Sequence, residues 1–129
     1  MRDRLVQVAK EAQANAYAPY SGFKVGAALQ ADDGRIFAGA NVENAAYGLT
    51  NCAERVALGA AVAAGARRFK RLVIVTEASP PSAPCGACRQ VLAEMGTELA
   101  VESVGPAGSR RWKLAALIPD RFGPEDLAP

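Results

Sequence analysis

Three cysteines are the residues of this chain whose type and spacing are best suited to chemistry. Cys85 and Cys88 are spaced so that both side chains fall on one face of a helix, where two thiolates can hold the same metal ion. Cys52 is the one other cysteine, and the sequence contains no histidine. Three sulfur ligands leave one position of a tetrahedral zinc ion for water, as in catalytic rather than structural zinc sites. The cysteines therefore predict a catalytic zinc centre with one ion per chain.

A carboxylate and a proline extend this pattern. Glu54 stands two positions after Cys52, and Pro84 directly precedes Cys85. Zinc deaminases of nucleobases carry a ligand-x-Glu segment followed by Pro-Cys-x-x-Cys, in which the Glu moves protons and is not a ligand. Locally, Glu54 also fits a capping box with Asn51, and a Cys-x-x-Cys pair alone also fits a redox dithiol or two small core residues. The whole pattern favours deaminase chemistry over these alternatives.

Composition narrows the class of protein. Apolar residues make up 50% of the chain and charged residues 22%, which indicates a folded protein. The net charge is only +2, and we expect the basic cluster at residues 67–71 to be a solvated helix end rather than a nucleic-acid surface. The odd number of cysteines argues against a disulfide framework. We see neither an apolar run of about 20 residues nor a signal peptide, so the expectation is a cytoplasmic protein with no membrane or nucleic-acid partner.

The periodicity of apolar residues and the turn signals predict the elements that position these groups. Helices are expected at residues 2–17, 52–64 and 85–95, and strands at residues 24–31, 35–42, 72–76, 98–104 and 110–115. The first two strands should form a hairpin around an Asp-Asp-Gly turn. Residues 44–51 are expected to form a loop, and the tail from Pro119 is rich in Pro and Asp.

This order predicts one α/β domain over residues 1–129. The run LVIVT at residues 72–76 is apolar throughout, as expected for a strand covered on both faces. Helices on both sides of a mixed five-stranded sheet give such a strand its cover, in a three-layer α/β/α arrangement. Both cysteine groups should then lie at helix N-termini, where backbone N–H groups and the helix dipole favour thiolate over thiol.

Four stretches of sequence resemble the cytidine deaminase family, specifically its short homotetrameric form with three cysteine ligands. They are residues 20–28 (YSGFKVGAA), 41–47 (NVENAAY), 52–55 (CAER) and 84–91 (PCGACRQV). The resemblance covers nearly the whole chain and implies the cytidine deaminase-like form of the α/β/α fold. It also implies that Cys52, Cys85 and Cys88 hold the zinc ion and that Glu54 is catalytic.

The resemblance further implies roles around a nucleoside. Asn41 and Glu43 would bind ribose hydroxyls, Phe23 would pack against the pyrimidine, the backbone of Ala53 would hold the base, Arg55 would donate hydrogen bonds to the thiolates, and Phe122 would reach across a subunit interface. Four of these side chains also have a simpler interpretation. Phe23 is otherwise a core residue, Glu43 a strand-end charge, Arg55 an exposed helix residue, and Phe122 a tail residue packed on its own subunit.

The reaction implied by the resemblance is hydrolytic deamination of free cytidine and deoxycytidine to uridine and deoxyuridine, with release of ammonia, in pyrimidine salvage. Zinc activates a water, Glu54 moves its proton to ring N3, the hydroxide attacks C4, and Glu54 then protonates the departing amine.

Rival interpretations are a blasticidin S deaminase on the same scaffold, a polynucleotide editor, and a noncatalytic zinc module with Glu54 as fourth ligand. Editors usually use a histidine ligand, which this chain lacks. The small residues over 54–64 fit either a helix interface in a homotetramer or packing of that helix on its own sheet.

Overall fold

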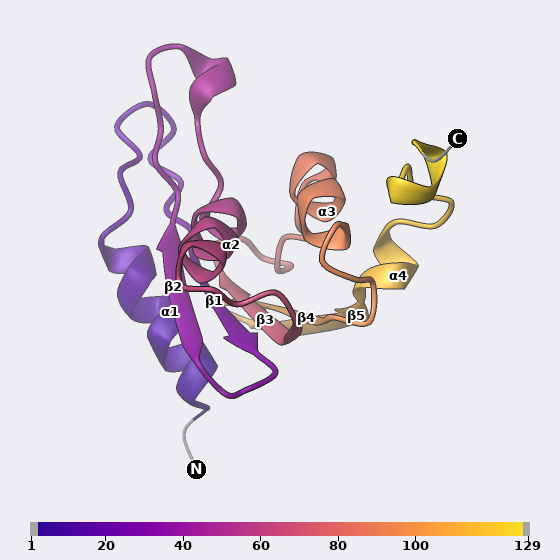
Figure 1. The fold of residues 1–129 in the computed structure, drawn as a ribbon. Coiled ribbons are helices and arrows are strands. Elements are labelled where there is room, and N and C mark those ends of the chain that lie inside the picture. Colours follow the sequence, from indigo (N-terminus) through magenta and orange to yellow (C-terminus); the bar gives the residue numbers. More distant parts are fainter. Residues whose placement is uncertain (1–2, 128–129) are drawn as a thin grey trace.

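The computed structural model describes residues 3–127, and a five-stranded sheet runs through the middle of it in the order β2-β1-β3-β4-β5 (Figure 1). The strands are β1 (Gly26–Ala31), β2 (Ile36–Ala40), β3 (Phe69–Val75), β4 (Ala100–Gly105) and β5 (Gly108–Lys113). β3 and β4 are parallel, whereas β1 is antiparallel to both β2 and β3 and β5 is antiparallel to β4. The prediction of a mixed five-stranded sheet is therefore confirmed.

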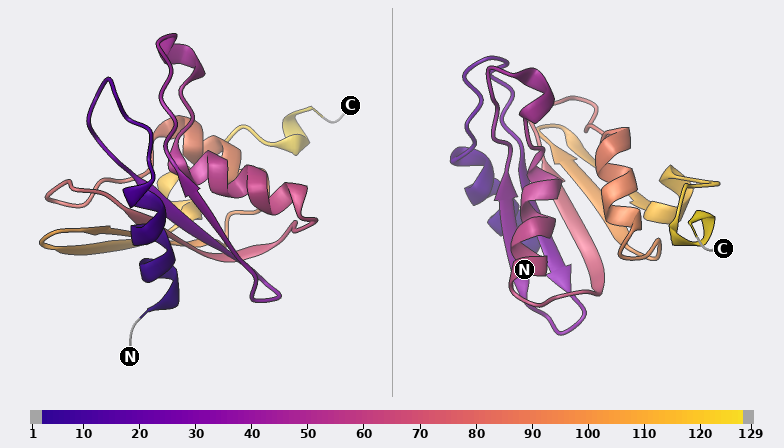
Figure 2. Two further views of the ribbon diagram at one scale, coloured as in Figure 1. Left: turned by 90° about the vertical axis from the view of Figure 1, so that its left-hand side faces the viewer. Right: turned by 45° about the horizontal axis from the view of Figure 1, so that its top comes forward.

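Helices cover both faces of this sheet (Figure 2). They are α1 (Arg4–Ala14), α2 (Ala53–Ala63), α3 (Gly86–Ala93) and the short α4 (Leu114–Leu117), with 3-10 turns η1 (Tyr47–Leu49) and η2 (Pro124–Asp126). α1 buries Leu5 and Ala9 against Val73 and Val75 on one face. On the other face, α2 and α3 share a core with residues that include Leu72. Within residues 3–127, none of the helices has the length and apolar character needed to cross a membrane.

The start of α2 is fixed by a close approach to β2. A Cβ atom added at Gly39 would lie 2.3 Å from the carbonyl oxygen of Ala53 and 2.5 Å from the amide nitrogen of Ala57. Only a glycine lets the helix backbone come this near the strand. Because Cys52 and Glu54 lie in this first turn, the contact also sets the position of the two groups.

Several boundaries differ from those expected. α1 is shorter than the predicted helix 2–17, whose residue 2 lies outside the described residues. β3 begins at Phe69, so part of the basic cluster 67–71 lies in a strand rather than at a helix end. Within the cluster, Arg67 does donate to the carbonyl of Val62 in the last turn of α2, at 3.0 Å. Arg71 instead pairs with Asp3 and Glu102.

The C-terminal elements also differ from the prediction. β4 begins at Ala100 rather than at residue 98, and β5 spans Gly108–Lys113 rather than 110–115. Residues 114 and 115, expected at the end of that strand, begin α4. Leu114 is fully buried in the core that includes residues of α2 and α3. Burial of this side chain favours the turn of the chain toward the core after Lys113.

Candidate metal centre and active site

The three cysteines converge although 33 residues separate the first two in the chain. Their Sγ atoms all lie within 4.8 Å of one another, and those of Cys52 and Cys85 are 3.9 Å apart. Tetrahedral zinc with Zn–S distances of about 2.3 Å places its sulfur ligands about 3.8 Å apart. The donor set and its spacing therefore fit a zinc ion.

Both helices present the sulfurs at their N-termini, as the sequence predicts. Cys52 is the N-cap of α2, and Cys85 is the N-cap of α3, where its Sγ accepts a hydrogen bond from the amide of Cys88 at 3.4 Å. The alternative capping box is not formed, because α2 has Cys52 rather than Asn51 at its N-cap and no side chain caps it. Glu54 is thus free of a capping role.

The protonation of the sulfurs depends on their neighbours. A hydrogen bond from the Cys88 thiol, aided by the guanidinium of Arg55, lowers the pKa of Cys52 to about 5. The same hydrogen bond, together with burial, raises the pKa of Cys88, which is its donor. Arg55 Nη2 lies 3.4 Å from the Cys52 sulfur and 3.4 Å from the carbonyl oxygen of Thr50. Arg55 therefore supplies positive charge beside a centre where three thiolates carry more negative charge than one zinc ion neutralises.

Glu54 is the carboxyl group beside this centre. Its side chain lines the same pocket as Cys52 and Cys85, and the residue is only 5% exposed. Burial raises its pKa, and the negative charge of Cys52 acts in the same direction. A carboxyl group that binds its proton more tightly than an exposed glutamate does is better suited to taking a proton and returning it during a reaction.

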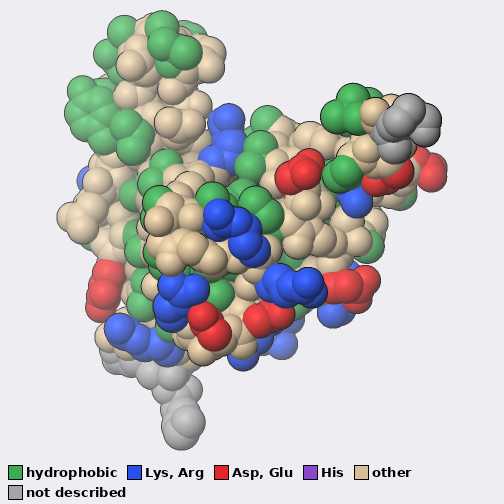
Figure 3. Space-filling model, in the orientation of Figure 1, with side chains coloured by type: hydrophobic (Ala, Val, Ile, Leu, Met, Phe, Trp, Pro, Cys, Tyr) green, Lys and Arg blue, Asp and Glu red, His purple; other side chains and the backbone are tan. Residues whose placement is uncertain are grey.

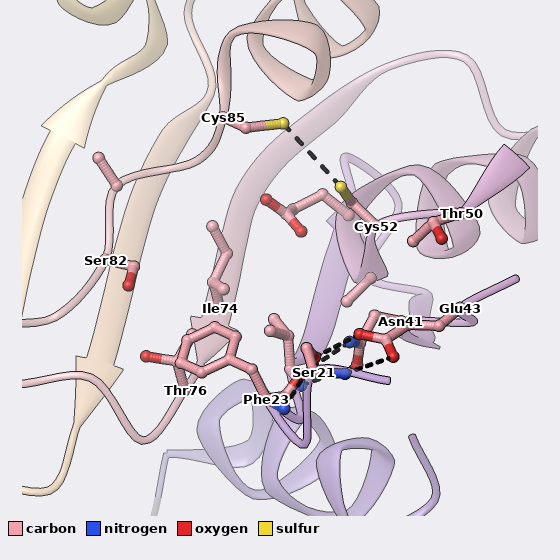
Figure 4. Close-up of a pocket in the computed structure, with 14 residues that line it drawn as sticks. Ser21, Phe23, Asn41, Glu43, Thr50, Cys52, Ile74, Thr76, Ser82 and Cys85 are labelled. Carbon is pink, nitrogen blue, oxygen red and sulfur yellow. Dashed lines mark hydrogen bonds between the residues drawn. The ribbon is translucent and has the colours of Figure 1, made fainter. Parts of the chain in front are cut away.

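The pocket has a volume of about 290 Å³, near the lower end of the range for small-molecule sites. It is lined by Ser21, Phe23, Val25, Asn41, Glu43, Thr50, Cys52, Ala53, Glu54, Ile74, Thr76, Ser82, Ala83 and Cys85. Figure 4 shows the sulfurs of Cys52 and Cys85 at one end of it, with Ser21, Asn41 and Glu43 at the other. The fold thus gathers into one cavity every predicted substrate residue except Phe122.

Two polar side chains at the far end are held by backbone groups. Asn41 accepts from the amide of Val25 and donates to the carbonyl of Phe23, both at 2.8 Å. Glu43 accepts from the amides of Tyr20 and Ser21 at 2.9 and 3.1 Å, and from the Ser21 hydroxyl. These bonds, led by that of the Ser21 hydroxyl, hold the pKa of Glu43 below its usual value. Glu43 is therefore an ordered carboxylate.

Sequence reasoning did not single out several lining residues, namely Ser21, Val25, Thr50, Ile74, Thr76, Ser82 and Ala83. Ser21 lies inside the stretch YSGFKVGAA that matches the family, which was the one available signal.

Phe122 lies elsewhere. It is 58% exposed and is absent from the residues that line the pocket of its own chain. Its carbonyl oxygen accepts a hydrogen bond from Gln90 Nε2 of α3 at 2.8 Å, which anchors the tail to the helix that also carries Cys88.

Comparison with known proteins decides the family. The family model described as the cytidine and deoxycytidylate deaminase zinc-binding region matches residues 1–103. The chain belongs to the cytidine deaminase family. A cytidine deaminase of Sporosarcina psychrophila is 46% identical over 128 residues, covering 98% of this chain and 94% of that protein. One of Mycobacterium tuberculosis is 48% identical over 120 residues, covering 92% and 87%.

Solved structures of the family agree with the fold. The crystal structure of cytidine deaminase from Burkholderia pseudomallei has a TM-score of 0.90 and 50% identity, covering 95% of this chain and all of that one. The corresponding structure from Mycobacterium tuberculosis has a TM-score of 0.80 and 46% identity, covering 92% and 94%. Together with the convergent cysteines, membership of this family confirms the expected fold, the zinc cofactor and the assignment as a hydrolase.

Proposed function

We propose that this member of the cytidine deaminase family hydrolyses free cytidine to uridine and ammonia. The observation that carries the proposal is the placement of buried Glu54 beside three converging sulfurs, in a cavity whose far end holds an ordered carboxylate at Glu43. A nucleoside needs a proton-transfer group beside a metal centre at its reacting ring and a hydrogen-bond acceptor at its sugar, and the cavity offers these at opposite ends.

The proposed proton steps belong to Glu54. A zinc ion held by Cys52, Cys85 and Cys88 would supply Lewis-acid chemistry that lowers the pKa of water. The Glu54 carboxylate accepts a proton from the attacking water and passes it to ring N3. The water oxygen bonds to C4, and Glu54 then takes the remaining proton of that hydroxyl group and delivers it to the amino group as the C4–N bond breaks, so water is consumed and ammonia released. Arg55 holds the Cys52 sulfur in place through these changes of charge.

The remaining lining residues orient the nucleoside. Asn41 keeps one amide hydrogen and one oxygen lone pair unused by its two backbone bonds, so it can bind a ribose hydroxyl. Glu43 offers a carboxylate oxygen to the same sugar, and Phe23 offers a ring face to the pyrimidine. The backbone of Ala53, which lines the pocket at the start of α2, would bind the base edge. Deoxycytidine as a second substrate, a role in pyrimidine salvage and a cytoplasmic location are part of the same proposal.

The purified protein should convert cytidine to uridine, seen as a loss of cytidine absorbance in the ultraviolet, and should contain about one equivalent of zinc per chain. Blasticidin S, tested in parallel, should react far more slowly. Preferential turnover of blasticidin S would assign the site to the rival substrate. A zinc-loaded protein that deaminates neither compound would support a noncatalytic zinc module instead.

We also propose that the chain forms a homotetramer with shared sites. On α2, Ala53, Ala57 and Ala61 are buried by the chain's own fold, so part of the small-residue run serves helix-on-sheet packing. Gly59 and Ala60 of the same helix remain exposed and leave room for a close neighbour. Figure 3 shows apolar side chains gathered on the segment that projects at upper left. The exposed large apolar residues of the chain include Tyr17, Tyr20, Tyr47 and Leu49.

Phe122→Ala should lower kcat/KM for cytidine by about tenfold without loss of zinc, because the variant removes an aromatic contact to substrate in a neighbouring site. Mixing it with an equal amount of Glu54→Ala chains, after dissociation and reassembly, should restore activity in about a quarter of the sites, where an intact Glu54 meets an intact Phe122. Steady-state rates and molecular mass in solution are the measurements. A monomer with full activity would contradict the shared site.

A further inference from the structure

Glu43 is fixed by a single turn of the chain. The segment 18–22 closes on itself through a hydrogen bond from the amide of Gly22 to the carbonyl of Ala18 at 2.9 Å, and Gly22 has a φ of +71°. This turn points two successive amides, those of Tyr20 and Ser21, at the same carboxylate oxygen, Oε1. Successive amides aimed at one point form a concave anion site.

The Ser21 hydroxyl completes this arrangement. It donates to Glu43 Oε2 and accepts from the amide of Phe23 at 2.9 Å. One hydroxyl therefore links the carboxylate at the sugar end of the pocket to the residue expected to face the base (Figure 4). Ser21 also lies on the pocket wall itself.

The hydrogen bonds from the turn leave part of the acceptor capacity of the Glu43 carboxylate free. A carboxylate has about four acceptor positions, two on each oxygen. The two amides occupy both positions on Oε1, and the Ser21 hydroxyl occupies one on Oε2. One acceptor position remains, and a ribose hydroxyl has one proton to donate.

We propose that Ser21 is a positioning residue that holds Glu43 with one acceptor position directed at a single ribose hydroxyl, and so contributes to recognition of the sugar. Without the Ser21 hydroxyl, the carboxylate keeps its two amide bonds but can rotate about them, and Oε2 gains a second open position. The nucleoside then binds more weakly, and Glu43 distinguishes less well between the ribose hydroxyls. The inference rests on the proposed binding of a nucleoside by Glu43.

The test is a double-mutant cycle with Ser21→Ala and Glu43→Ala, measured on cytidine, 2′-deoxycytidine and 3′-deoxycytidine. Ser21→Ala should raise KM for cytidine about tenfold, as for loss of a hydrogen bond to a charged group, with kcat changed less than about twofold. The effect should vanish on whichever deoxynucleoside lacks the recognised hydroxyl. Ser21→Ala should add nothing in the Glu43→Ala background, and Ser21→Thr should restore the KM of cytidine.

A matched control is Ser109→Ala, on an exposed position of the edge strand β5, which should leave every constant unchanged. Equal rises in KM on all three substrates, or effects of Ser21→Ala and Glu43→Ala that simply add, would overturn the positioning role. A Ser21→Ala protein that loses kcat and zinc together would assign Ser21 a purely structural role in the turn. If Glu43→Ala itself leaves the KM of cytidine unchanged, the proposed sugar site fails, independently of Ser21.

Discussion

Replacing Glu54 by Gln should lower kcat for cytidine by about two to four orders of magnitude, while the protein keeps its fold and its zinc. Gln preserves the size of the side chain and can donate and accept hydrogen bonds, but it cannot take a proton from water and return it. Glu54 is only 5% exposed, so a carboxylate from solvent does not readily replace the lost group in the variant. Turnover rate, zinc content and circular dichroism are the three measurements.

Glu11→Gln is the matched control, since it makes the same chemical change on the exposed surface of α1, across the sheet from the pocket. It should retain full activity. Near-normal turnover by Glu54→Gln would remove Glu54 from the reaction. Loss of zinc in that variant would instead indicate that the carboxylate is a metal ligand, as the noncatalytic zinc module requires.

Local patterns were sufficient to predict the layers of the fold. The apolar run 72–76 correctly indicated a strand covered on both faces, and Val73 and Leu72 do pack on opposite sides of the sheet. The true start of β3 at Phe69 was missed because Arg71 breaks the apolar pattern. Its charge is balanced by Asp3 and Glu102, which lie 68 and 31 residues away in sequence, and no local signal carries such pairing.

In the candidate site, too, some residues could be predicted from local sequence patterns and others could not. Cys85 and Cys88 have a spacing that reveals their chemistry, because a helix turn places both side chains on one face. Cys52 and Glu54 were found through the motif that they complete with this pair. The bonds of Glu43 depend instead on how the turn 18–22 meets the segment after β2, joined by a bridge between Tyr17 and Val42. That meeting is a property of the folded chain, so Ser21 could not be singled out from its neighbours in sequence.

Cys88→Ala should abolish stoichiometric zinc binding and all measurable turnover, and should lower the melting temperature. Cys88 is fully buried in the first turn of α3, and its Sγ lies within 4.8 Å of the sulfurs of both Cys52 and Cys85. Two remaining thiolates cannot hold zinc in the tetrahedral geometry that three provide. Free zinc at about a thousand times its Kd stabilises a folded protein by about 4 kcal/mol, which for a chain of this size corresponds to about 15 °C.

The loss of a buried sulfur also weakens packing, so the metal contribution must be measured separately. Wild-type protein stripped by a chelator keeps the Cys88 side chain, and its melting temperature should fall and then recover when zinc is returned. Cys88→Ala should be insensitive to both treatments, because the site that couples binding to folding is gone. If the variant instead binds one equivalent of zinc and deaminates cytidine at the wild-type rate, Cys88 is a core residue and the metal must be held by other groups. A zinc-dependent melting temperature in the wild type that is absent from the variant would tie the sulfur cluster directly to the stability of the folded chain.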